Sequence, residues 1–155
     1  MKQHEFRVAI QWTGNLGTGT SGYASYSRNH ELSAPGKSTR IEGSSAVARG
    51  DHSRYNPEEL LVGALSACHM MWVLHLCADA GIVITEYADA PVGEMAEHPD
   101  GSGEFTRVVL KPRMVIADVA RVEEAQAMHA RDHHVCCLAR SMNFPVENQP
   151  TVTVG

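Results

Sequence analysis

Asn56-Pro57-Glu58-Glu59-Leu60-Leu61 opens the stretch that decides the fold, which continues through mostly apolar residues and ends at Gly81. An asparagine N-cap, a proline at the first helical position and two carboxylates in the first turn predict the start of a helix. Gly81 predicts its end. The helix would be about 24 residues and roughly 36 Å long. Because it is apolar on more than one face, we predict a central helix, covered by a sheet on one side and by something else on the other.

The segments around this helix predict β-strands and two shorter helical elements. A strand with alternating apolar residues is followed by a glycine-rich loop and a returning strand, which is typical of a hairpin. Pro112 predicts an interruption in one of the later strands. The order βββ-α-ββ-α-α-β predicts a single α+β domain over residues 1–155, with the long helix packed on antiparallel sheets. Strands are expected at 6–12, 23–28, 39–45, 82–95, 104–117 and 146–154, and helical elements at 118–133 and 136–142.

Composition narrows the classes of function. The chain has 155 residues, of which 43% are hydrophobic and 20% charged, as in ordinary globular proteins. Its 18 acidic and 13 basic residues give a net charge of −5, which argues against nucleic acid as a partner. The N-terminal residues contain no signal core, and no run of about 18 uninterrupted apolar residues predicts a membrane span. We therefore expect a cytoplasmic, reducing location and no membrane partner.

Four cysteines are the main candidates for chemistry, namely Cys68, Cys77, Cys136 and Cys137. On the long helix, Cys68 and Cys77 are nine positions apart and so lie on opposite faces. Adjacent cysteines such as Cys136 and Cys137 bridge each other only through a strained ring. If either of them comes within about 6 Å of Cys68, Cα to Cα, the pair can cycle between dithiol and disulfide.

Three short motifs connect these cysteines with a known family. Asn56-Pro57-Glu58-Glu59-Leu60-Leu61 opens the long helix, Ala67-Cys68 lies within it, and His133-His134-Val135-Cys136 lies near the C-terminal end. The first cysteine also follows Glu58 by ten positions. In motifs, spacing and order of elements, the chain resembles the OsmC/Ohr family of thiol-dependent hydroperoxide reductases over essentially its whole length.

The resemblance implies specific roles for several residues. Cys68 matches the peroxidatic thiol, Cys136 the resolving thiol, and Glu58 the carboxylate that orients a catalytic arginine. Arg49 is favoured slightly over Arg28 as that arginine. Two positions depart from the family pattern. Cys137 replaces the usual proline, and Ala139 replaces a common serine. Either Cys136 or Cys137 could therefore be the resolving thiol.

The resemblance also implies a reaction in which an organic hydroperoxide and a dithiol give an alcohol, water and a disulfide. The thiolate of Cys68 would attack the peroxide, and a nearby guanidinium would raise the fraction of thiolate at neutral pH. The resulting sulfenic acid would condense with the second thiol. No prosthetic group is expected, and the reductant would be a dihydrolipoyl group or a small thiol.

The spacing of Glu58 and Cys68 carries a geometric consequence. Ten residues along a straight helix rise by about 15 Å, so these two side chains cannot meet on one unbroken helix. Either the helix breaks near Gly63, or Glu58 serves a site built with a partner subunit. The second possibility predicts an intertwined homodimer, which the family resemblance also implies.

Two other functions remain open from the sequence. His129, His133 and Cys136 have spacings that would share one helical face, and Cys68 or His134 could complete a zinc site. The chain has no C-x-x-C or H-E-x-x-H motif to strengthen this interpretation. The remaining possibility is a non-catalytic, stress-associated binding protein in which Cys68 is simply buried.

Overall fold

Helix α1 (Pro57–Asp79) forms as the local sequence signals predict. The computed structural model describes residues 3–46, 49–132 and 135–155. At the start of α1, Asn56 and Glu59 form a reciprocal cap. The Glu59 N–H donates to Asn56 Oδ1 at 2.7 Å, and the Asn56 N–H donates to Glu59 Oε2 at 3.2 Å. At the other end, Gly81 adopts a φ of 71°, and the Ile82 N–H closes the last turn on the Cys77 carbonyl at 2.8 Å.

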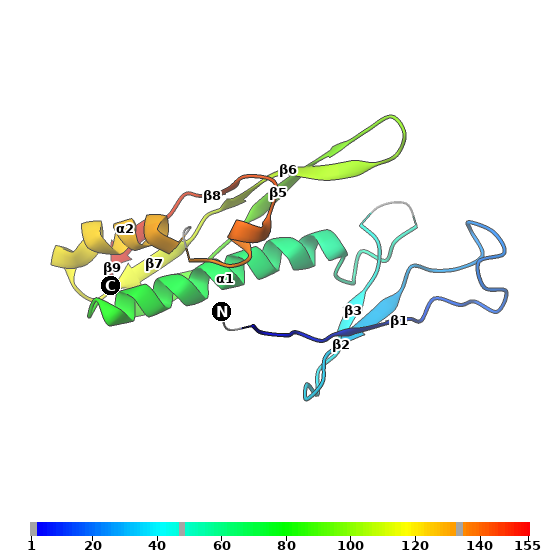
Figure 1. Ribbon diagram of the computed structural model, residues 1–155, viewed down its shortest axis with the longest axis horizontal. Helices are drawn as coiled ribbons and strands as arrows, with labels where there is room; N and C mark the ends of the chain where they lie inside the picture. Colours follow the sequence, from blue (N-terminus) through cyan, green and yellow to red (C-terminus); the bar gives the residue numbers. More distant parts are fainter. Residues whose placement is uncertain (1–2, 47–48, 133–134) are drawn as a thin grey trace. The chain divides into compact units, whose positions relative to one another are not determined.

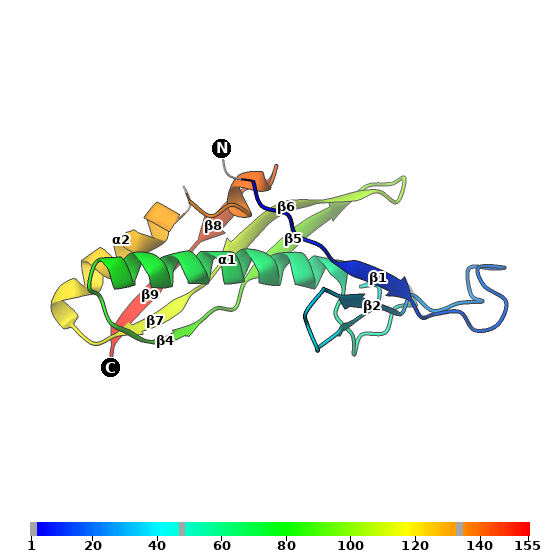
Figure 2. The same ribbon diagram turned by 60° about the horizontal axis from the view of Figure 1, so that its bottom comes forward.

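Two three-stranded sheets pack along α1 in the unit formed by Leu61–Gly155 (Figures 1 and 2). In each sheet, an antiparallel pair is extended by a parallel strand from the C-terminal end of the chain. The sheets are therefore mixed, whereas the sequence predicted only antiparallel pairing. One sheet has the order β4 (Ile84–Ala88), β7 (Arg113–Ile116), β9 (Thr151–Val154), and the other β5 (Val92–Glu97), β6 (Gly103–Leu110), β8 (Val146–Asn148).

The chain passes between the two sheets four times, once through the long connection from β7 to β8 and three times through a short connection that contains a proline. Pro91 separates β4 from β5, Pro112 separates β6 from β7, and Pro150 separates β8 from β9. Proline cannot donate to a strand ladder, so each one ends a strand. The interruption predicted at Pro112 is confirmed. The predictions of single strands over 82–95, 104–117 and 146–154 are wrong, because each segment contains two strands in different sheets.

The apolar side chains of this unit form two clusters. The first contains Val73 and Cys77 of α1 together with residues of β7 and of helix α2 (Val122–Asp132). The second contains Leu65 of α1, Val108 and Leu110 of β6 and Val146 of β8, beside the short helix η2 (Ala139–Ser141). Asp118 caps the 3-10 turn η1 (Val119–Arg121) that leads into α2, as predicted, by accepting from the Ala120 N–H at 2.9 Å.

One face of α1 packs on these clusters, and the opposite face is exposed. By length and hydropathy alone α1 could cross a membrane, but its buried side chains pack in the two clusters as those of a core helix do. Within the Leu61–Gly155 unit no second element covers its other face, so the second cover expected from the sequence stays a prediction. Five residues at helical spacing form this exposed stripe: Ala64, Ala67, Met71, Leu74 and Ala78.

Residues Met1–Leu60 form the other compact unit, whose antiparallel sheet has the order β1 (Ala9–Trp12), β2 (His30–Ser33), β3 (Ile41–Gly43). The predicted hairpin is present, but its returning strand begins at His30, so the strand expected at 23–28 is wrong. Backbone pairing in that segment is reduced to an isolated antiparallel bridge between Asn15 and Tyr26, and the Trp12 indole N–H donates to the Ser27 carbonyl at 2.9 Å. The apolar face expected to be half-buried in the first strand is exposed, with Ile10 61% accessible.

Candidate functional site

Cys68 and Cys136 meet inside the Leu61–Gly155 unit. Their Sγ atoms are 2.7 Å apart and share a hydrogen bond. Cys68 lies in the middle of α1, and Cys136 lies in the segment between α2 and η2. Both thiols are free and buried, with exposed fractions of 6% and 1%. The prediction that a thiol of the vicinal pair approaches Cys68 is confirmed, and Cys77 is buried in the first apolar cluster instead.

The surroundings of Cys68 act on its acidity in opposite directions. Burial raises the pKa of the Cys68 thiol most, and the hydrogen bond with Cys136 raises it further. The Leu138 N–H and the Cys137 side chain lower the pKa through hydrogen bonds to the Cys68 sulfur. Residues 136–138 therefore wrap around this sulfur from three successive positions. No arginine or lysine of the described residues is among the main causes of this shift.

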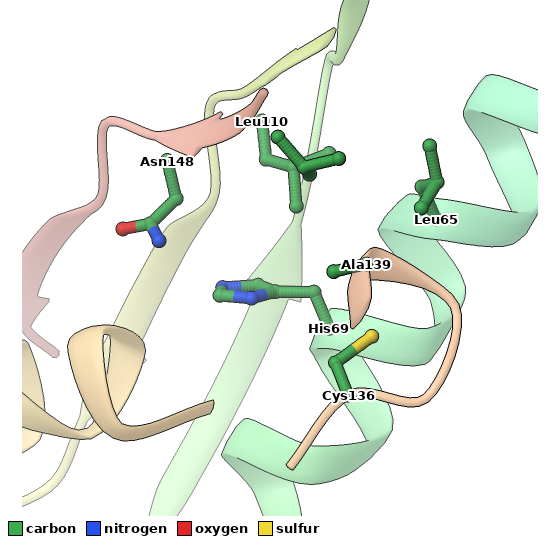
Figure 3. Close-up of a pocket in the computed structure, with 7 residues that line it drawn as sticks. Leu65, His69, Leu110, Cys136, Ala139 and Asn148 are labelled. Carbon is green, nitrogen blue, oxygen red and sulfur yellow. The ribbon is translucent and has the colours of Figure 1, made fainter. Parts of the chain in front are cut away.

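A small cavity of about 10 Å³ lies beside this thiol pair (Figure 3). This volume is about what a single water molecule needs. In Figure 3 the amide of Asn148 points toward the ring of His69, while leucine and alanine side chains close the rest of the space. The cavity thus offers polar groups to a small molecule next to Cys136. Its lining residues are Leu65, His69, Leu110, Cys136, Ala139, Val146 and Asn148.

A buried histidine pair lies next to the cavity. His69 Nε2 and His129 Nδ1 are 2.9 Å apart, and the two rings are stacked. Burial and the neighbouring His69 lower the pKa of His129 to about 4, so His129 is neutral at neutral pH. Sequence reasoning singled out His129 as a possible zinc ligand but not its contact with His69. Its only signal is the position of His69 directly after Cys68.

The zinc site considered from the sequence has no counterpart among the described residues. No group of three or more His, Cys, Asp or Glu side chains there could hold a metal ion. Cys68 and Cys136 lie too close together for two thiolate ligands of one tetrahedral zinc, whose bonds to sulfur are about 2.3 Å long. His133 and His134, which the zinc interpretation also used, lie outside the described residues.

The other predicted site residues belong to the Met1–Leu60 unit. Arg28 lies over the rings of Tyr23 and Tyr26, 4.3 Å from each centroid, and donates to the carbonyls of both at 3.0 Å. Arg49 is exposed and has a φ of 65°. Glu58 is half-buried, and its Oε2 has no hydrogen-bond partner among the described residues. The pairing of Glu58 with either arginine stays a prediction.

Helix α1 is continuous, which decides between the two explanations for the spacing of Glu58 and Cys68 as far as a helix break is concerned. The helix is unbroken from Pro57 to Asp79, so the predicted possibility of a break near Gly63 is wrong. Glu58 and Cys68 of one chain are then separated by about 15 Å of helical rise.

Comparison with known proteins places this geometry in a family. The chain is similar to the structure of an OsmC-like protein of unknown function from Vibrio cholerae, with 26% identity, a TM-score of 0.84, and coverage of 96% of this chain and 100% of that one. The fold also matches an organic hydroperoxide resistance protein from Elizabethkingia anophelis, with 18% identity, a TM-score of 0.68 and coverage of 99% of both chains. It matches another from Bacillus subtilis, with 14% identity, a TM-score of 0.62, and coverage of 96% of this chain and 98% of that one. No curated protein sequence matches the chain significantly. Residues 50–150 match the family described as OsmC-like protein, and the chain therefore belongs to the OsmC-like family.

Proposed function

We propose that this protein reduces organic hydroperoxides to alcohols with electrons from a dithiol, in defence against oxidative stress. The observation that carries the proposal is the buried pair of sulfur atoms, Cys68 Sγ and Cys136 Sγ, 2.7 Å apart. A sulfenic acid formed at one member of such a pair is within immediate reach of the other thiol. The fold shared with organic hydroperoxide resistance proteins supports the same substrate class.

In the proposed reaction, the Cys68 thiolate attacks the outer oxygen of the hydroperoxide, and the peroxide bond breaks. The alkoxide that is released takes up a proton and leaves as the alcohol, and Cys68 carries a sulfenic acid. Cys136 then attacks the Cys68 sulfur, water is released, and a disulfide joins the two residues. An external dithiol reduces this disulfide and returns both thiols. The 2.7 Å contact of Cys136 with Cys68 and the burial of its thiol favour Cys136 over the exposed Cys137 as the resolving thiol.

Peroxidase assays of cysteine variants test this function. Purified protein is mixed with cumene hydroperoxide and dihydrolipoamide, and hydroperoxide loss is followed. Cys68→Ser should abolish turnover, because no nucleophile remains. Cys136→Ser should still form a sulfenic acid at Cys68, detectable with dimedone, but no disulfide. Cys77→Ala is the matched control, since this thiol lies in a separate cluster. Turnover by Cys68→Ser at the wild-type rate would contradict the proposal.

A homodimer is part of the proposal. The exposed stripe on α1 is apolar and follows the i, i+3, i+4 spacing of a helix–helix seam. Met71 is 60% exposed and Leu74 36% in the single chain, although both are large apolar residues. A second copy of the chain that packs on this stripe would remove them from water.

The oligomeric state in solution tests the dimer. Light scattering should give about 34 kDa, twice the 16.9 kDa of one chain. Met71→Lys should shift the mass toward that of the monomer, because it places a charge in the seam. Val119→Lys, at an exposed valine outside α1, is the control and should stay dimeric. A monomeric wild-type protein would refute this part of the proposal.

Glu58 would act within this dimer, where it would orient Arg49 or Arg28 toward the Cys68 thiolate of a composite site. Support comes from the half-buried carboxylate, whose Oε2 is unpartnered among the described residues, and from the unbroken α1 that separates it from Cys68 of its own chain. Mixing inactive Glu58→Ala and Cys68→Ser proteins under subunit exchange should recover activity. Mixtures that stay inactive would count against shared sites.

A further inference from the structure

Three thiols meet at the candidate site, and they differ in their access to solvent. Cys136 Sγ is 2.7 Å from Cys68 Sγ, and Cys137, the next residue along the chain, lowers the pKa of Cys68. Cys68 and Cys136 are buried, with exposed fractions of 6% and 1%, whereas Cys137 is exposed. A thiol that solvent can reach is thus the direct chain neighbour of the buried pair.

This difference in access affects how a disulfide at the site is reduced. A thiol reduces a disulfide by direct attack on one of its sulfur atoms. A bond between Cys68 and Cys136 would be enclosed, so a dihydrolipoyl group carried on another protein could not approach it without opening the site. Cys137 can be reached from solvent, and it is the chain neighbour of Cys136, one of the two bonded residues.

The backbone around the vicinal cysteines is fixed while the Cys137 side chain faces solvent. The Arg140 N–H donates to the Cys136 carbonyl at 3.1 Å, and the Ser141 hydroxyl donates to the Cys137 carbonyl at 2.7 Å. These bonds tie both carbonyls to η2 and hold the two side chains at neighbouring places beside α1. Exchange between Cys136 and Cys137 then requires side-chain movement but no rearrangement of the helix.

We propose that Cys137 is an exchange thiol, which passes the disulfide from the buried Cys68–Cys136 pair to an external dithiol. The inference rests on the proposed function, because that reaction generates the buried disulfide. The Cys137 thiolate attacks the Cys68 sulfur, the bond to Cys136 breaks, and Cys136 leaves as a thiolate that takes up the proton lost by Cys137. A Cys68–Cys137 disulfide results, and one of its sulfurs faces solvent.

The external dithiol completes the sequence in two further steps. One of its thiolates attacks the Cys137 sulfur, and Cys68 leaves as a thiolate. The second thiol of the reductant then displaces Cys137 from the mixed disulfide. In sum, two electrons and two protons pass from the dithiol to the protein, and the dithiol becomes a disulfide.

The test separates this exchange from peroxidase activity by using a different oxidant. Reduced protein is oxidised with one equivalent of diamide, and the disulfide is mapped by peptide mass spectrometry. Reduction by dihydrolipoamide is then followed by acid quenching and alkylation of the recovered thiols. Cys137→Ser and Cys137→Ala are compared with wild type, and Val135→Ser, on the other side of Cys136, is the matched control.

Both Cys137 variants should form the Cys68–Cys136 disulfide but be reduced at least tenfold more slowly than wild type, while Val135→Ser keeps the wild-type rate. A limiting monothiol should be trapped on Cys137 of the oxidised wild-type protein. Reduction of both variants at the wild-type rate, or trapping on Cys68 or Cys136, would overturn the inference. An absence of hydroperoxide turnover with these exchange rates intact would reject only the proposed function.

Discussion

His69 Nε2 and His129 Nδ1 lie 2.9 Å apart and join the middle of α1 to α2 through two buried rings. His129 is fully buried, and His69 has only 3% of its surface exposed. A neutral imidazole has one nitrogen that donates and one that accepts, so a neutral pair can share this hydrogen bond. Protonation of His129 would leave a buried charge beside a second imidazole, which explains its lowered pKa.

This pair makes the stability of the protein depend on pH. The pKa of His129 is about 4 in the folded protein and about 6.5 in an unfolded chain, so between these values the unfolded state binds more protons. Stability contributed by neutral His129 is therefore complete above pH 6.5 and lost as the pH falls toward 4. The linkage amounts to about 3 kcal/mol over this interval.

Urea unfolding at several pH values between 7.5 and 4.5 measures this effect. His129→Gln lacks the titrating group and should be less stable at neutral pH but show a much flatter decline on acidification. His75→Gln, at an exposed histidine of α1, is the control and should keep the wild-type slope. A slope in His129→Gln as steep as that of wild type would rule out His129 as its source.

The reciprocal cap at the start of α1 should contribute measurably to stability. Asn56→Ala removes the acceptor of the Glu59 N–H, and we expect a loss of about 1 kcal/mol in the free energy of unfolding. Asn56→Ser retains a capping oxygen and should lose much less. Equal stability of the alanine and serine variants, measured by urea denaturation, would show that the cap does not stabilise the helix.

The sequence was sufficient for α1 because its signals are local. An N-cap, a first-turn proline and a terminal glycine act within one helical turn, and the helix begins and ends where they predict. The strands were harder, because the local pattern does not show that the chain changes sheets at Pro91 and Pro150. Which sheet a strand joins depends on partners far along the chain, and neither alternation nor composition records that choice.

Some features of the candidate site could likewise be predicted from the sequence, and others could not. Contact of Cys68 with the vicinal cysteines could be predicted from motifs that the family shares, although the residues are 68 positions apart. The histidine pair could not, because His69 and His129 are 60 positions apart and neither belongs to a motif. The place of the arginine that the resemblance implies also depends on long-range packing, so spacing favoured Arg49 over Arg28 only slightly.

Asp89 should stabilise the crossing between the two sheets. Its carboxylate accepts a hydrogen bond from the Ser66 hydroxyl of α1 at 2.6 Å and another from the Lys111 N–H at 2.7 Å. Asp89→Ala breaks both bonds and leaves the amide of Lys111 without this acceptor, so we expect a loss of about 1–3 kcal/mol. Glu86→Ala, at an exposed acidic residue of β4, is the control for charge removal. If the two variants are equally stable in urea, the bridging role is wrong.

The vicinal cysteines should shift the acidity of Cys68 in opposite directions. Cys136 raises the pKa of Cys68 through its hydrogen bond and its charge, whereas Cys137 lowers it through a hydrogen bond. Cys136→Ala should therefore lower the pKa of Cys68, and Cys137→Ala should raise it. The change would appear as opposite displacements of the pH profile for alkylation at Cys68.

Iodoacetamide labelling from pH 6 to 10, read out by mass spectrometry of the peptide that contains Cys68, gives this profile without interference from the other thiols. The midpoint of the profile reports the pKa, whereas the plateau rate reports access, so a cavity left by Cys136→Ala affects mainly the plateau. Val135→Ala controls for a change of side-chain volume in the same segment. Displacement of both cysteine variants in one direction would mean that general loosening of the segment, and not the individual thiol contacts, sets the acidity of Cys68.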